Sequence, residues 1–240
     1  MTLERNLIKN CTCGNSTNFK LGKKSDINIL ICENCGVSHQ ELIGWDDQRY
    51  YDFYRSDYHT FFQKKKGIIT YEERYNHDCK VAAIRLTEYI GLLDSTGQGL
   101  DIGSSNSAFV HESKKLGFDC IGLEPGENIG DDSVTIRGTL DTVEFSAEQF
   151  SWITMHDSIE HIVDVVSSLK RLYSILKPNG VLILDLPDYF IEAGRHHWKH
   201  IEHLWFFTEE QLTNLLKQYG FNIIEIKKPI PGKLVFYTRK

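Results

Sequence analysis

The sequence predicts an α/β fold in which helices cover a mixed sheet of seven strands, with a small cysteine-rich module in front of it. Three observations support this prediction. Strand-like and helix-like patterns alternate from residue 95 to the C-terminus, a short turn joins the last two strand-like segments, and four of the six cysteines lie within the first 35 residues. A chain of 240 residues can form one full α/β domain and a small appendage. We therefore expect three parts, at residues 1–44, 45–94 and 95–240.

The first part contains two cysteine pairs. They read Cys11-Thr-Cys13-Gly and Cys32-Glu-Asn-Cys35-Gly, and an apolar run over 27–31 leads into the second pair. A glycine after each pair lets the backbone turn so that its amides can point at sulfur, and four thiolates complete a closed tetrahedral zinc site. We predict a zinc-ribbon-like module whose metal is structural. A module that keeps its fold while binding metal weakly is the alternative.

The second part is an aromatic connector followed by a helix. Residues 45–63 read WDDQRYYDFYRSDYHTFFQ, and the spacing of their tyrosines places several on one helical face. The tyrosines in question are Tyr50, Tyr51, Tyr54 and Tyr58. Such a segment either packs on the domain or acts as a lid whose hydroxyls reach the active site. An apolar stripe over 71–93 then predicts a helix.

The third part alternates strands and helices. Strands are expected at 99–103, 120–124, 134–137, 151–156, 180–186, 222–227 and 233–237, and helices at 107–116, 159–176 and 209–218. Alternation of this kind predicts a mostly parallel, Rossmann-like sheet covered by helices. The turn at 229–232 joins the last two strands as a hairpin, which makes the sheet mixed.

The turn after the first of these strands has the features of a nucleoside site. Asp101 and Gly103 lie at the strand end, and Glu124 follows Gly103 by 21 positions, which is the spacing of a carboxylate that binds a ribose diol. A dinucleotide pocket needs further glycines for the pyrophosphate, and this turn has serines there. The Asp101 carboxylate would repel a phosphate but attract an ammonium or sulfonium group. S-adenosylmethionine, an adenosine with a positive centre and no phosphate, fits both features.

Four motifs resemble those of class I S-adenosylmethionine-dependent methyltransferases. LDIGSSNSAF resembles the first motif, GLEP the second, WITMHDSIEH the fourth, and LKPNGVLILDLPD the entry to the fifth strand. The resemblance covers roughly residues 95 to 240. Ser105 and Ser107 depart from it, because they stand where the family has glycines.

This resemblance implies a set of cofactor-binding residues. They are Asp101, Gly103, Ser104, Ser105, Asn106, Glu124, Pro125, Thr139, Leu140, His156, Asp157 and Ser158. Asp101 and the turn would hold the methionine part, Glu124 the ribose, the segment at 138–140 the adenine, and His156 with Asp157 would border the sulfonium. Asp157 and Glu160 are also spaced as a capping box for the next helix, which gives Glu160 a structural alternative.

A run of histidines follows the fifth strand of the sheet. His196-His197-Trp198-Lys199-His200-Ile201-Glu202-His203-Leu204-Trp205-Phe206-Phe207-Thr208 holds four histidines within eight residues, and each buried imidazole needs hydrogen-bond partners. The run resembles the E-H-L-x-x-F-(S/T) stretch of methyltransferases that act on sugars and related metabolites, some of which carry an N-terminal zinc-binding module.

That resemblance implies acid–base roles for Glu202, His203 and His200. We expect His203 to be the base and Glu202 to orient it, since a histidine is suited to proton removal at neutral pH. His161 either contacts the substrate or packs. A metal site within the run is an open alternative, although the resembled stretch has no zinc site there. Thr208 is expected to cap the helix at 209–218 together with Gln211.

Composition limits the choice of partners. Apolar residues make up 41% and charged residues 25%, as in ordinary globular proteins, and the net charge of −6 gives no basic field that would attract nucleic acid. No apolar run approaches the roughly 20 residues of a membrane helix, and the first residues lack the apolar core of a signal peptide. We expect a cytoplasmic protein that acts on a small molecule and binds neither nucleic acid nor a membrane. The oligomeric state is not indicated.

The function expected from these features is methyl transfer from S-adenosylmethionine. Sugar C-methyltransferases with the zinc module usually have a further C-terminal domain, and this chain ends soon after the last strand. We therefore favour O-methylation of a sugar, nucleotide-sugar or phosphate-type group of a surface polysaccharide precursor. The alternatives are sugar C-methylation and a methyltransferase fold that binds without turnover.

Overall fold

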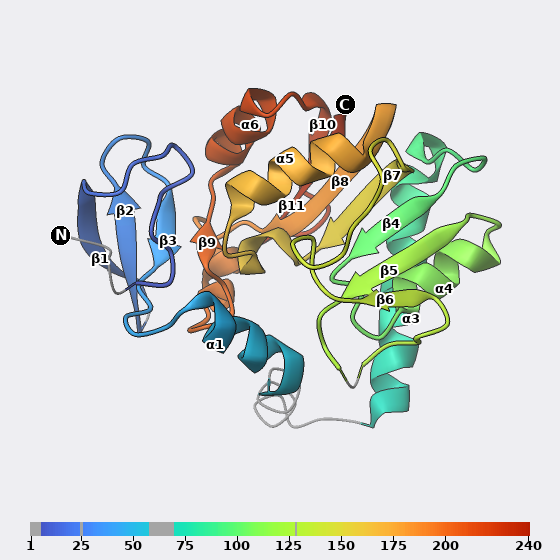
Figure 1. Ribbon diagram of the computed structural model, residues 1–240, viewed down its shortest axis with the longest axis horizontal. Helices are drawn as coiled ribbons and strands as arrows, with labels where there is room; N and C mark the ends of the chain where they lie inside the picture. The colour runs from blue at the N-terminus through green and yellow to red at the C-terminus, as the bar shows by residue number, and fades with distance from the viewer. Residues whose placement is uncertain (1–5, 25, 58–69, 128) are drawn as a thin grey trace. The chain divides into compact units, whose positions relative to one another are not determined.

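The computed structural model describes residues 6–24, 26–57, 70–127 and 129–240, and Figure 1 shows its helices and strands. The chain divides into two compact units. The first unit comprises Met1–Asp47, Asp157–Tyr173 and Ile183–Arg239, and the second comprises Gln48–His156, Ser174–Leu182 and Lys240.

The described strands form two sheets. The larger sheet has seven strands, which are β4 (Gly99–Ile102), β5 (Cys120–Glu124), β6 (Thr135–Arg137), β7 (Phe150–His156), β8 (Leu176–Pro187), β10 (Asn222–Lys227) and β11 (Lys233–Arg239). Their order is β10-β11-β8-β7-β4-β5-β6. The pairs β4–β5, β4–β7 and β5–β6 are parallel, whereas β10 and β11 form an antiparallel hairpin. The predicted α/β class, a Rossmann-like mixed sheet of seven strands, is confirmed.

The second unit contains the parallel core around β4. Successive strands β4, β5 and β6 extend to one side of β4, and the chain then returns to place β7 on its other side. This reversal is the topological switch point, where ligands of open α/β sheets bind beyond the carboxyl ends of the strands. Leu100, Leu123 and Trp152 are fully or almost fully buried in this core. The unit therefore provides a rigid frame for the turns that follow β4, β5 and β7.

Two helices of the second unit pack together and against this frame. They are α3 (Tyr71–Tyr89) and α4 (Ala108–Lys115), which lie on the same side of β4 and β5 in Figure 1. Thr70 and Glu73 cap α3 with a reciprocal capping box, which defines its first turn. The short 3-10 helix η2 (Ile90–Leu92) follows α3. The predicted helix at 71–93 is thus confirmed, with a tighter last turn.

The connector before α3 is only partly described. It begins as α1 (Asp47–Asp52) and continues as one turn of π-helix, η1 (Phe53–Asp57). Tyr50 is buried, and its ring lies 5.0 Å from that of Tyr54 and 6.3 Å from that of Tyr51. The predicted shared face is therefore seen for Tyr50 and Tyr54, which are four residues apart. Tyr58, the fourth, lies outside the described residues.

The first unit contains the smaller sheet. Its strands are β1 (Phe19–Lys24), β2 (Ile27–Cys32), β3 (Ser38–Gln40) and β9 (Trp205–Phe206), in the order β1-β2-β3-β9 and all antiparallel. A buried cluster supports it, formed by Ile27, Ile29, Tyr189, Trp198 and Phe206. The strand β9 was not predicted, because a pair of residues is too short to show a periodic pattern. The cysteine module therefore shares its sheet with the end of the histidine run.

The helices of the first unit begin at defined caps. They are α5 (Val165–Ile175), which ends beyond this unit, α6 (Glu209–Gln218), and the 3-10 helices η3 (Ile159–His161) and η4 (Glu192–His197). Thr208 accepts from the backbone of Gln211, whose side chain accepts from Thr208, so the predicted capping box of α6 is confirmed. The predicted helix at 159–176 is wrong at its start.

The Asp164 side chain caps α5. It accepts from the backbone and hydroxyl of Ser167, which starts the α-helix after Asp164. The capping box proposed for Asp157 and Glu160 does not form, because the Asp157 carboxylate contacts Lys233 and the Glu160 carboxylate is fully buried. Glu160 therefore has a different environment from the one its spacing predicts.

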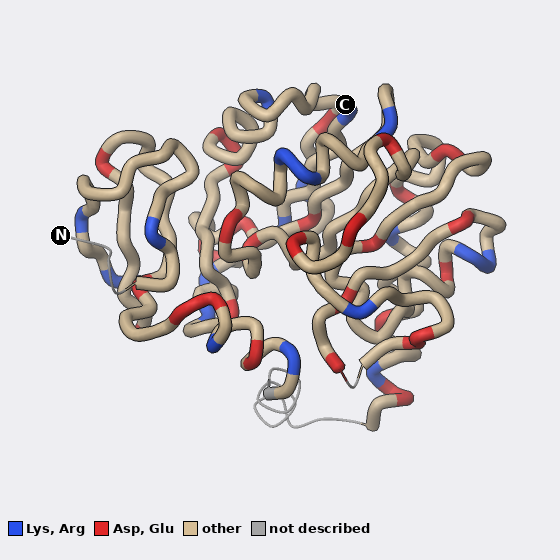
Figure 2. Tube along the Cα trace, viewed as in Figure 1, with Lys and Arg blue, Asp and Glu red and all other residues tan. Residues whose placement is uncertain are grey.

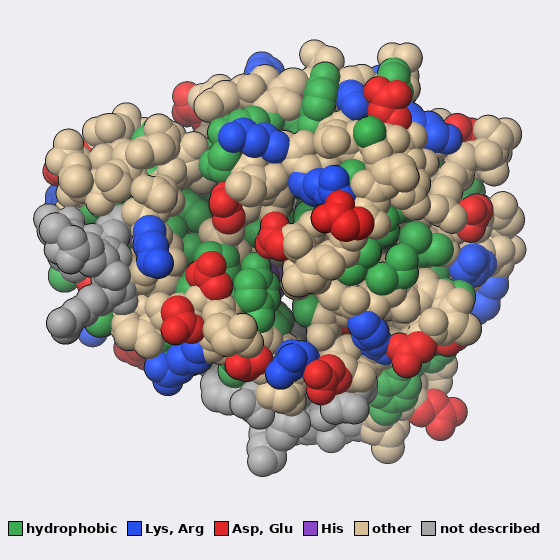
Figure 3. All heavy atoms as spheres, viewed as in Figure 1, with side chains coloured by type: hydrophobic (Ala, Val, Ile, Leu, Met, Phe, Trp, Pro, Cys, Tyr) green, Lys and Arg blue, Asp and Glu red, His purple; other side chains and the backbone are tan. Residues whose placement is uncertain are grey.

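Charges of both signs are spread along the chain. Figure 2 shows Lys and Arg interspersed with Asp and Glu along the trace, and the face seen in Figure 3 carries the same mixture. Within the described residues, no helix has both the length and the apolar character needed to cross a membrane.

Candidate functional site

The turn after β4 adopts a glycine-like conformation. Gly103, Ser105 and Ser107 all have positive φ angles, of 73°, 48° and 63°. Side chains disfavour this left-handed region because Cβ crowds the following carbonyl oxygen. The two serines thus adopt the conformation of the glycines that they replace in the family motif, at a cost in backbone strain. The turn keeps the shape that the motif requires.

Glu124 at the end of β5 is held by this turn. Its Oε2 accepts from the backbone N–H of Ser105 and its Oε1 from that of Gly126, each at 2.8 Å. Burial raises the pKa of Glu124, and these two amides together with Arg137 partly offset that rise. Because each carboxylate oxygen has two lone pairs, both can still accept from a hydroxyl. The carboxylate is fixed in place and retains capacity for a diol.

Asp101 at the end of β4 belongs to a chain of hydrogen-bonding groups. Thr154 donates its hydroxyl to Asp101 Oδ1 at 2.7 Å, and His156 Nδ1 lies 3.2 Å from the same oxygen. His156 Nε2 lies 2.9 Å from the hydroxyl of Tyr89 on α3. The structure thus joins two predicted cofactor residues, Asp101 and His156, and adds Tyr89, which the sequence pattern did not indicate.

The motif-one asparagine is tied to α3 in a similar way. Asn106 donates from Nδ2 to Asp78 Oδ2 at 2.7 Å, and Arg74 Nε lies 3.0 Å from the same oxygen. Helix α3 therefore contacts the turn after β4 through Asp78 and the end of β7 through Tyr89.

The predicted adenine side is built from the loops after β5 and β6. Gly138 N donates to Glu124 O at 3.1 Å, and the next residues include the buried Leu140 and the half-buried Thr139. Pro125 is half-buried beside Glu124.

The connector contacts both of these loops. Arg55 Nε lies 3.1 Å from Glu127 Oε1, and the Tyr51 hydroxyl donates to Asp141 Oδ2 at 3.3 Å. The backbone N–H of Glu127 also donates to Arg55 O at 3.2 Å. One end of the connector is thus attached to the predicted adenosine side.

A second group of polar side chains lies in the first unit, and we call it the polar cluster. It consists of Asp157, Glu160, His161, Asp185, Tyr189, Lys199, Glu202, His203 and Lys233. The clustered residues come from η3, β8, the histidine run and β11. Glu160, Glu202 and His203 are at most 4% exposed. So many buried polar groups in one place are costly unless they are paired.

His203 sits at the centre of specific contacts. Its Nδ1 lies 2.8 Å from the Tyr189 hydroxyl, and its Nε2 lies 3.9 Å from Glu202 Oε1. Lys199 Nζ lies 3.0 Å from the same Glu202 oxygen. The backbone of this segment is fixed by Gln40 of β3, whose side chain donates to His203 O and accepts from Ile201 N, each at 2.7 Å. The predicted pair of Glu202 and His203 is therefore together and held rigidly.

Burial determines the protonation of these histidines. It lowers the pKa of His203 well below the usual value, and the charges of His161 and Lys199 lower it further. Burial also lowers the pKa of His161, which Glu202 partly offsets. Burial therefore favours the neutral form of both imidazoles.

Lys233 has two acidic neighbours. Its Nζ contacts Asp157 Oδ1 and lies 3.3 Å from Asp185 Oδ1. Burial acts to lower the pKa of Lys233, but these two carboxylates outweigh it and raise the pKa. Asp157 and Ser158, which the sequence assigns to the cofactor, both belong to the first unit, and Asp157 contacts Lys233. His156 belongs to the second unit.

Not every predicted catalytic residue joins this cluster. His200 is exposed, and among the described residues it makes no hydrogen bond or ring contact with Glu202 or His203. Tyr189, Lys199 and Lys233 were not predicted.

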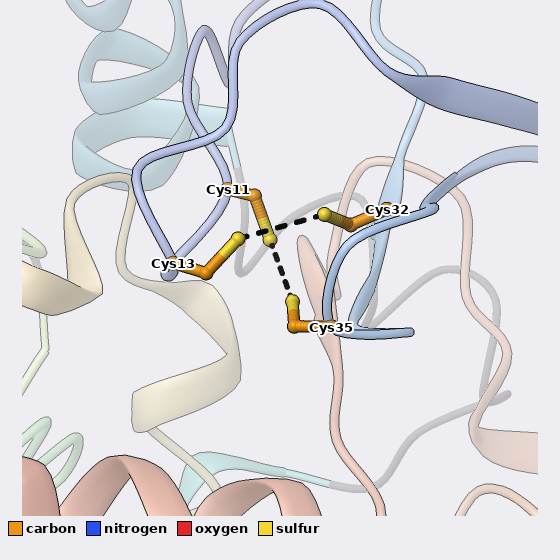
Figure 4. Close-up of side chains that lie close together, drawn as sticks. All are labelled: Cys11, Cys13, Cys32 and Cys35. Atoms are coloured by element: carbon orange, nitrogen blue, oxygen red, sulfur yellow. Dashed lines mark hydrogen bonds between the residues drawn. The ribbon is translucent and has the colours of Figure 1, made fainter.

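The four predicted metal-ligating cysteines lie together (Figure 4). The Sγ atoms of Cys11 and Cys35 are 3.4 Å apart, and those of Cys13 and Cys32 are 3.6 Å apart. Four sulfurs at about 2.3 Å from one zinc ion would be separated by roughly 3.8 Å. None of the four is in a disulfide. The spacing therefore fits a tetrahedral zinc site.

Hydrogen bonds to sulfur support this fit. Burial acts to raise the pKa of Cys32, but the Asn15 side chain and the backbone amides of Cys35 and Asn34 outweigh it and lower the pKa to about 7. Asn15 O also accepts from Cys11 N at 2.8 Å, which closes the turn of the short first pair. The single residue between Cys11 and Cys13 is thus compatible with a four-sulfur site.

Comparisons with known proteins agree with this geometry. A family model described as a methyltransferase domain matches residues 71–226. Two curated relatives are both named ubiquinone biosynthesis O-methyltransferase. The one from Dinoroseobacter shibae is 23% identical over 156 residues, 53% of this chain and 61% of its own length. The one from Bradyrhizobium diazoefficiens is 28% identical over 144 residues, 49% of this chain and 55% of its own length. The chain thus spans a little over half the length of these relatives.

Solved structures share the fold. A methyltransferase from Thermotoga maritima, described as SAM-dependent and a possible histamine N-methyltransferase, has a TM-score of 0.55 at 21% identity, covering 70% of this chain and 94% of that one. A SAM-dependent methyltransferase from Archaeoglobus fulgidus has a TM-score of 0.57 at 15% identity, covering 77% and 100%. At these identities the likeness concerns the fold alone.

Proposed function

We propose a methyl-transfer function for this chain, which belongs to the methyltransferase domain family through the match over residues 71–226. In the proposed reaction a methyl group passes from S-adenosylmethionine to an oxygen of a small polar acceptor. The bound donor supplies an electrophilic methyl group on a sulfonium. The chain must then bind the donor, align the acceptor and remove one proton.

The observation that carries this proposal is the cradle around Glu124. Two backbone amides fix its carboxylate at the end of β5, and Asp101 lies at the end of the adjacent strand β4. A fixed carboxylate suits a ribose diol, and a second carboxylate suits an ammonium or sulfonium but not a phosphate. This combination supports S-adenosylmethionine over a dinucleotide.

The remaining cofactor roles follow from position. The turn from Gly103 to Asn106 would hold the methionine part, and the loops with Pro125, Thr139 and Leu140 would flank the adenosine. The contacts of Arg55 and Tyr51 with those loops support a lid role for the connector. His156 would act through Asp101, to which it is bonded.

For proton removal we assign His203 as the base. Its neutral imidazole can accept a proton, and Glu202, 3.9 Å from Nε2, would stabilise the imidazolium that forms. Tyr189 at Nδ1 would fix the orientation of the ring. His200 is exposed and has no described contact with Glu202 or His203, so an acid–base role for His200 is less well supported than the roles of Glu202 and His203.

The acceptor we favour is a sugar, a nucleotide-linked sugar or a phosphate-type group of a polysaccharide precursor. The polar cluster offers lysine, glutamate and histidine groups, which suit hydroxyl-rich molecules. The two curated relatives are named as O-methyltransferases, which supports oxygen as the atom methylated. Because their names refer to ubiquinone biosynthesis, a phenolic quinone precursor is the comparison compound in the assay. Sugar C-methylation and binding without turnover are the alternatives.

We assign zinc to the four cysteines as a structural ion. A site with four protein ligands has no open position for chemistry. We expect the protein to act in the cytoplasm on a small molecule, with no role for nucleic acid or membrane binding.

The test is label transfer from methyl-labelled S-adenosylmethionine to a panel of acceptors. The panel contains nucleotide-linked sugars, a sugar phosphate and a phenolic quinone precursor. We expect transfer to a member of the sugar group and a loss of about 100-fold or more in His203→Ala, as is usual for a general base. His196→Ala, an exposed histidine of the same run, is the matched control. Transfer to none of the compounds, with donor binding intact, would favour a binding protein.

A further inference from the structure

Glu160 is a buried carboxylate that no protein donor satisfies. It is 0% exposed, and neither of its oxygens has a hydrogen-bond partner among the described residues. Burial raises its pKa well above the usual value, and the charge of Asp157 raises it further. A carboxylate in such a place normally binds a cation or remains protonated. Its surroundings decide between these two states.

The imidazoles of His161 and His203 lie close to the Glu160 carboxylate. Ligand atoms of Glu160, His161 and His203 all lie within 4.8 Å of one another. The two histidine rings are perpendicular, with their centroids 4.8 Å apart. All three residues belong to the first unit, and they come from η3 and the histidine run. One carboxylate and two imidazoles make a donor set that is common for first-row transition metals.

Each imidazole already has a partner on its other nitrogen. His161 Nδ1 lies 2.6 Å from Glu202 O, and because a carbonyl only accepts, this nitrogen carries the proton and the ring lone pair is on Nε2. His203 Nδ1 lies 2.8 Å from the Tyr189 hydroxyl, whose oxygen can accept a hydrogen bond from Nδ1–H. A hydrogen bond from the distant nitrogen to a carbonyl or oxygen is the usual support of a metal-ligating histidine. Both rings therefore have the hydrogen bond on Nδ1 that supports such a ligand.

The nearby cations do not prevent a second positive charge. Lys233 is paired with Asp157 and Asp185, and Lys199 is paired with Glu202. Each ammonium thus has a carboxylate partner of its own, and although the charge of Lys233 also acts on Glu160, no ammonium among the described residues is hydrogen-bonded to the Glu160 carboxylate.

From these observations we propose that Glu160, His161 and His203 bind a divalent first-row transition-metal ion. Three protein ligands leave at least one position open, in contrast to the four cysteines. The site includes the base of the proposed function. An ion on Nε2 of His203 takes the lone pair that would accept a proton, so metal-loaded protein should transfer methyl groups more slowly than protein without this ion.

The test compares zinc content and affinity in wild type, Glu160→Gln and His196→Ala. Each protein is equilibrated with excess zinc, dialysed, and measured by elemental analysis, and zinc affinity is titrated with a competing chelator. We expect wild type and His196→Ala to hold one equivalent more than Glu160→Gln. The affinity for that equivalent should fall by more than the roughly 10–100-fold that loss of an outer partner costs. Equal metal content and affinity in wild type and Glu160→Gln would overturn the proposal.

Cobalt distinguishes this site from the cysteine site. A four-thiolate site gives charge-transfer absorption from sulfur to cobalt, whereas a carboxylate–imidazole site does not. Glu160→Gln should keep the sulfur bands and lose only the remaining cobalt absorption. If the sulfur bands disappear as well, the substitution has disrupted the fold. His161→Asn, at a partly exposed position, is then tested in its place, and it should also keep the sulfur bands and lose the remaining cobalt absorption. If both variants keep the cobalt absorption that does not come from sulfur, the proposed site is refuted.

The outcome is separable from that of the proposed function. Metal content is measured without donor or acceptor, and none of the three proposed metal ligands is among the residues assigned to the donor. A normal metal count without any methyl transfer would contradict the function and leave the metal site standing.

Discussion

Glu124 and Glu160 are two buried glutamates in opposite situations. Glu124, in the second unit, accepts one backbone hydrogen bond on each oxygen. Glu160, in the first unit, has no donor on either oxygen among the described residues. The first carboxylate is satisfied by the backbone around it, whereas the second is not satisfied by any described donor. Burial alone therefore does not reveal what a carboxylate does; the state of its partners does.

The largest effect should follow from removing the satisfied carboxylate. Glu124→Ala deletes the ribose contact and leaves the Ser105 and Gly126 amides unpaired. Hydrogen bonds to charged groups contribute about 1.5–3 kcal/mol each, so two lost contacts predict about 100-fold or more weaker binding of S-adenosylmethionine. Calorimetry measures this. Glu88→Ala, at an exposed glutamate of α3 that has no role in the proposed site, should change the affinity by less than threefold, and an equal loss in both variants would contradict the assigned role.

A buried histidine of the first unit gives the next largest effect. Burial lowers the pKa of His39 to about 4, although Gln40 O partly offsets the shift. The unfolded chain, with a pKa of about 6.5, binds the proton more readily, so the free energy of unfolding should fall as the pH drops from about 7 to 4. The loss is at most about 3 kcal/mol from this group, and it levels off below pH 4. Denaturant unfolding of wild type and His39→Phe measures it. Identical pH slopes in the two proteins would show that His39 is not responsible.

The unsatisfied carboxylate should give an effect of the opposite sign. In metal-free protein Glu160→Met replaces a buried group without partners by an apolar one, and such changes are often neutral or stabilising by about 1–3 kcal/mol. Glu124→Met should lower the free energy of unfolding by a similar amount, because it leaves the backbone N–H groups of Ser105 and Gly126 without an acceptor. Thermal or denaturant unfolding of both variants compares them directly. Destabilisation by Glu160→Met would mean that this carboxylate has a partner in solution.

The smallest effect concerns the strained turn. Ser105 has a φ of 48°, and Ser105→Gly keeps the backbone amide that Glu124 needs while removing Cβ from a left-handed conformation. The relief should raise the free energy of unfolding by about 1 kcal/mol, with unchanged donor affinity. Ser104→Gly, beside it at a residue without positive φ, is the control and should give no gain. A gain in both variants would rule out backbone strain as the cause.

The same contrast explains what could be predicted from the sequence. The proximity of Glu124 to the turn after β4 was predictable because the two are linked by one short β–α–β unit, in which chain spacing fixes spatial neighbours. The polar cluster was predictable only where its residues are consecutive, as for Glu202 and His203. Tyr189 and Lys233 lie outside the histidine run in sequence and reach the cluster only in the folded chain, so no local sequence pattern predicts them. The start of the helix predicted at 159–176 failed for a related reason, since the spacing of Asp157 and Glu160 imitates a cap while tertiary contacts use both residues elsewhere.

Titration of the protein with S-adenosylmethionine in a calorimeter tests the central claim most directly, with S-adenosylhomocysteine and a nicotinamide dinucleotide as comparison ligands. Heat of binding for the donor and its demethylated product, and none for the dinucleotide, is the result expected from Asp101 and Glu124. Binding of the dinucleotide together with no heat from either sulfur compound would contradict it.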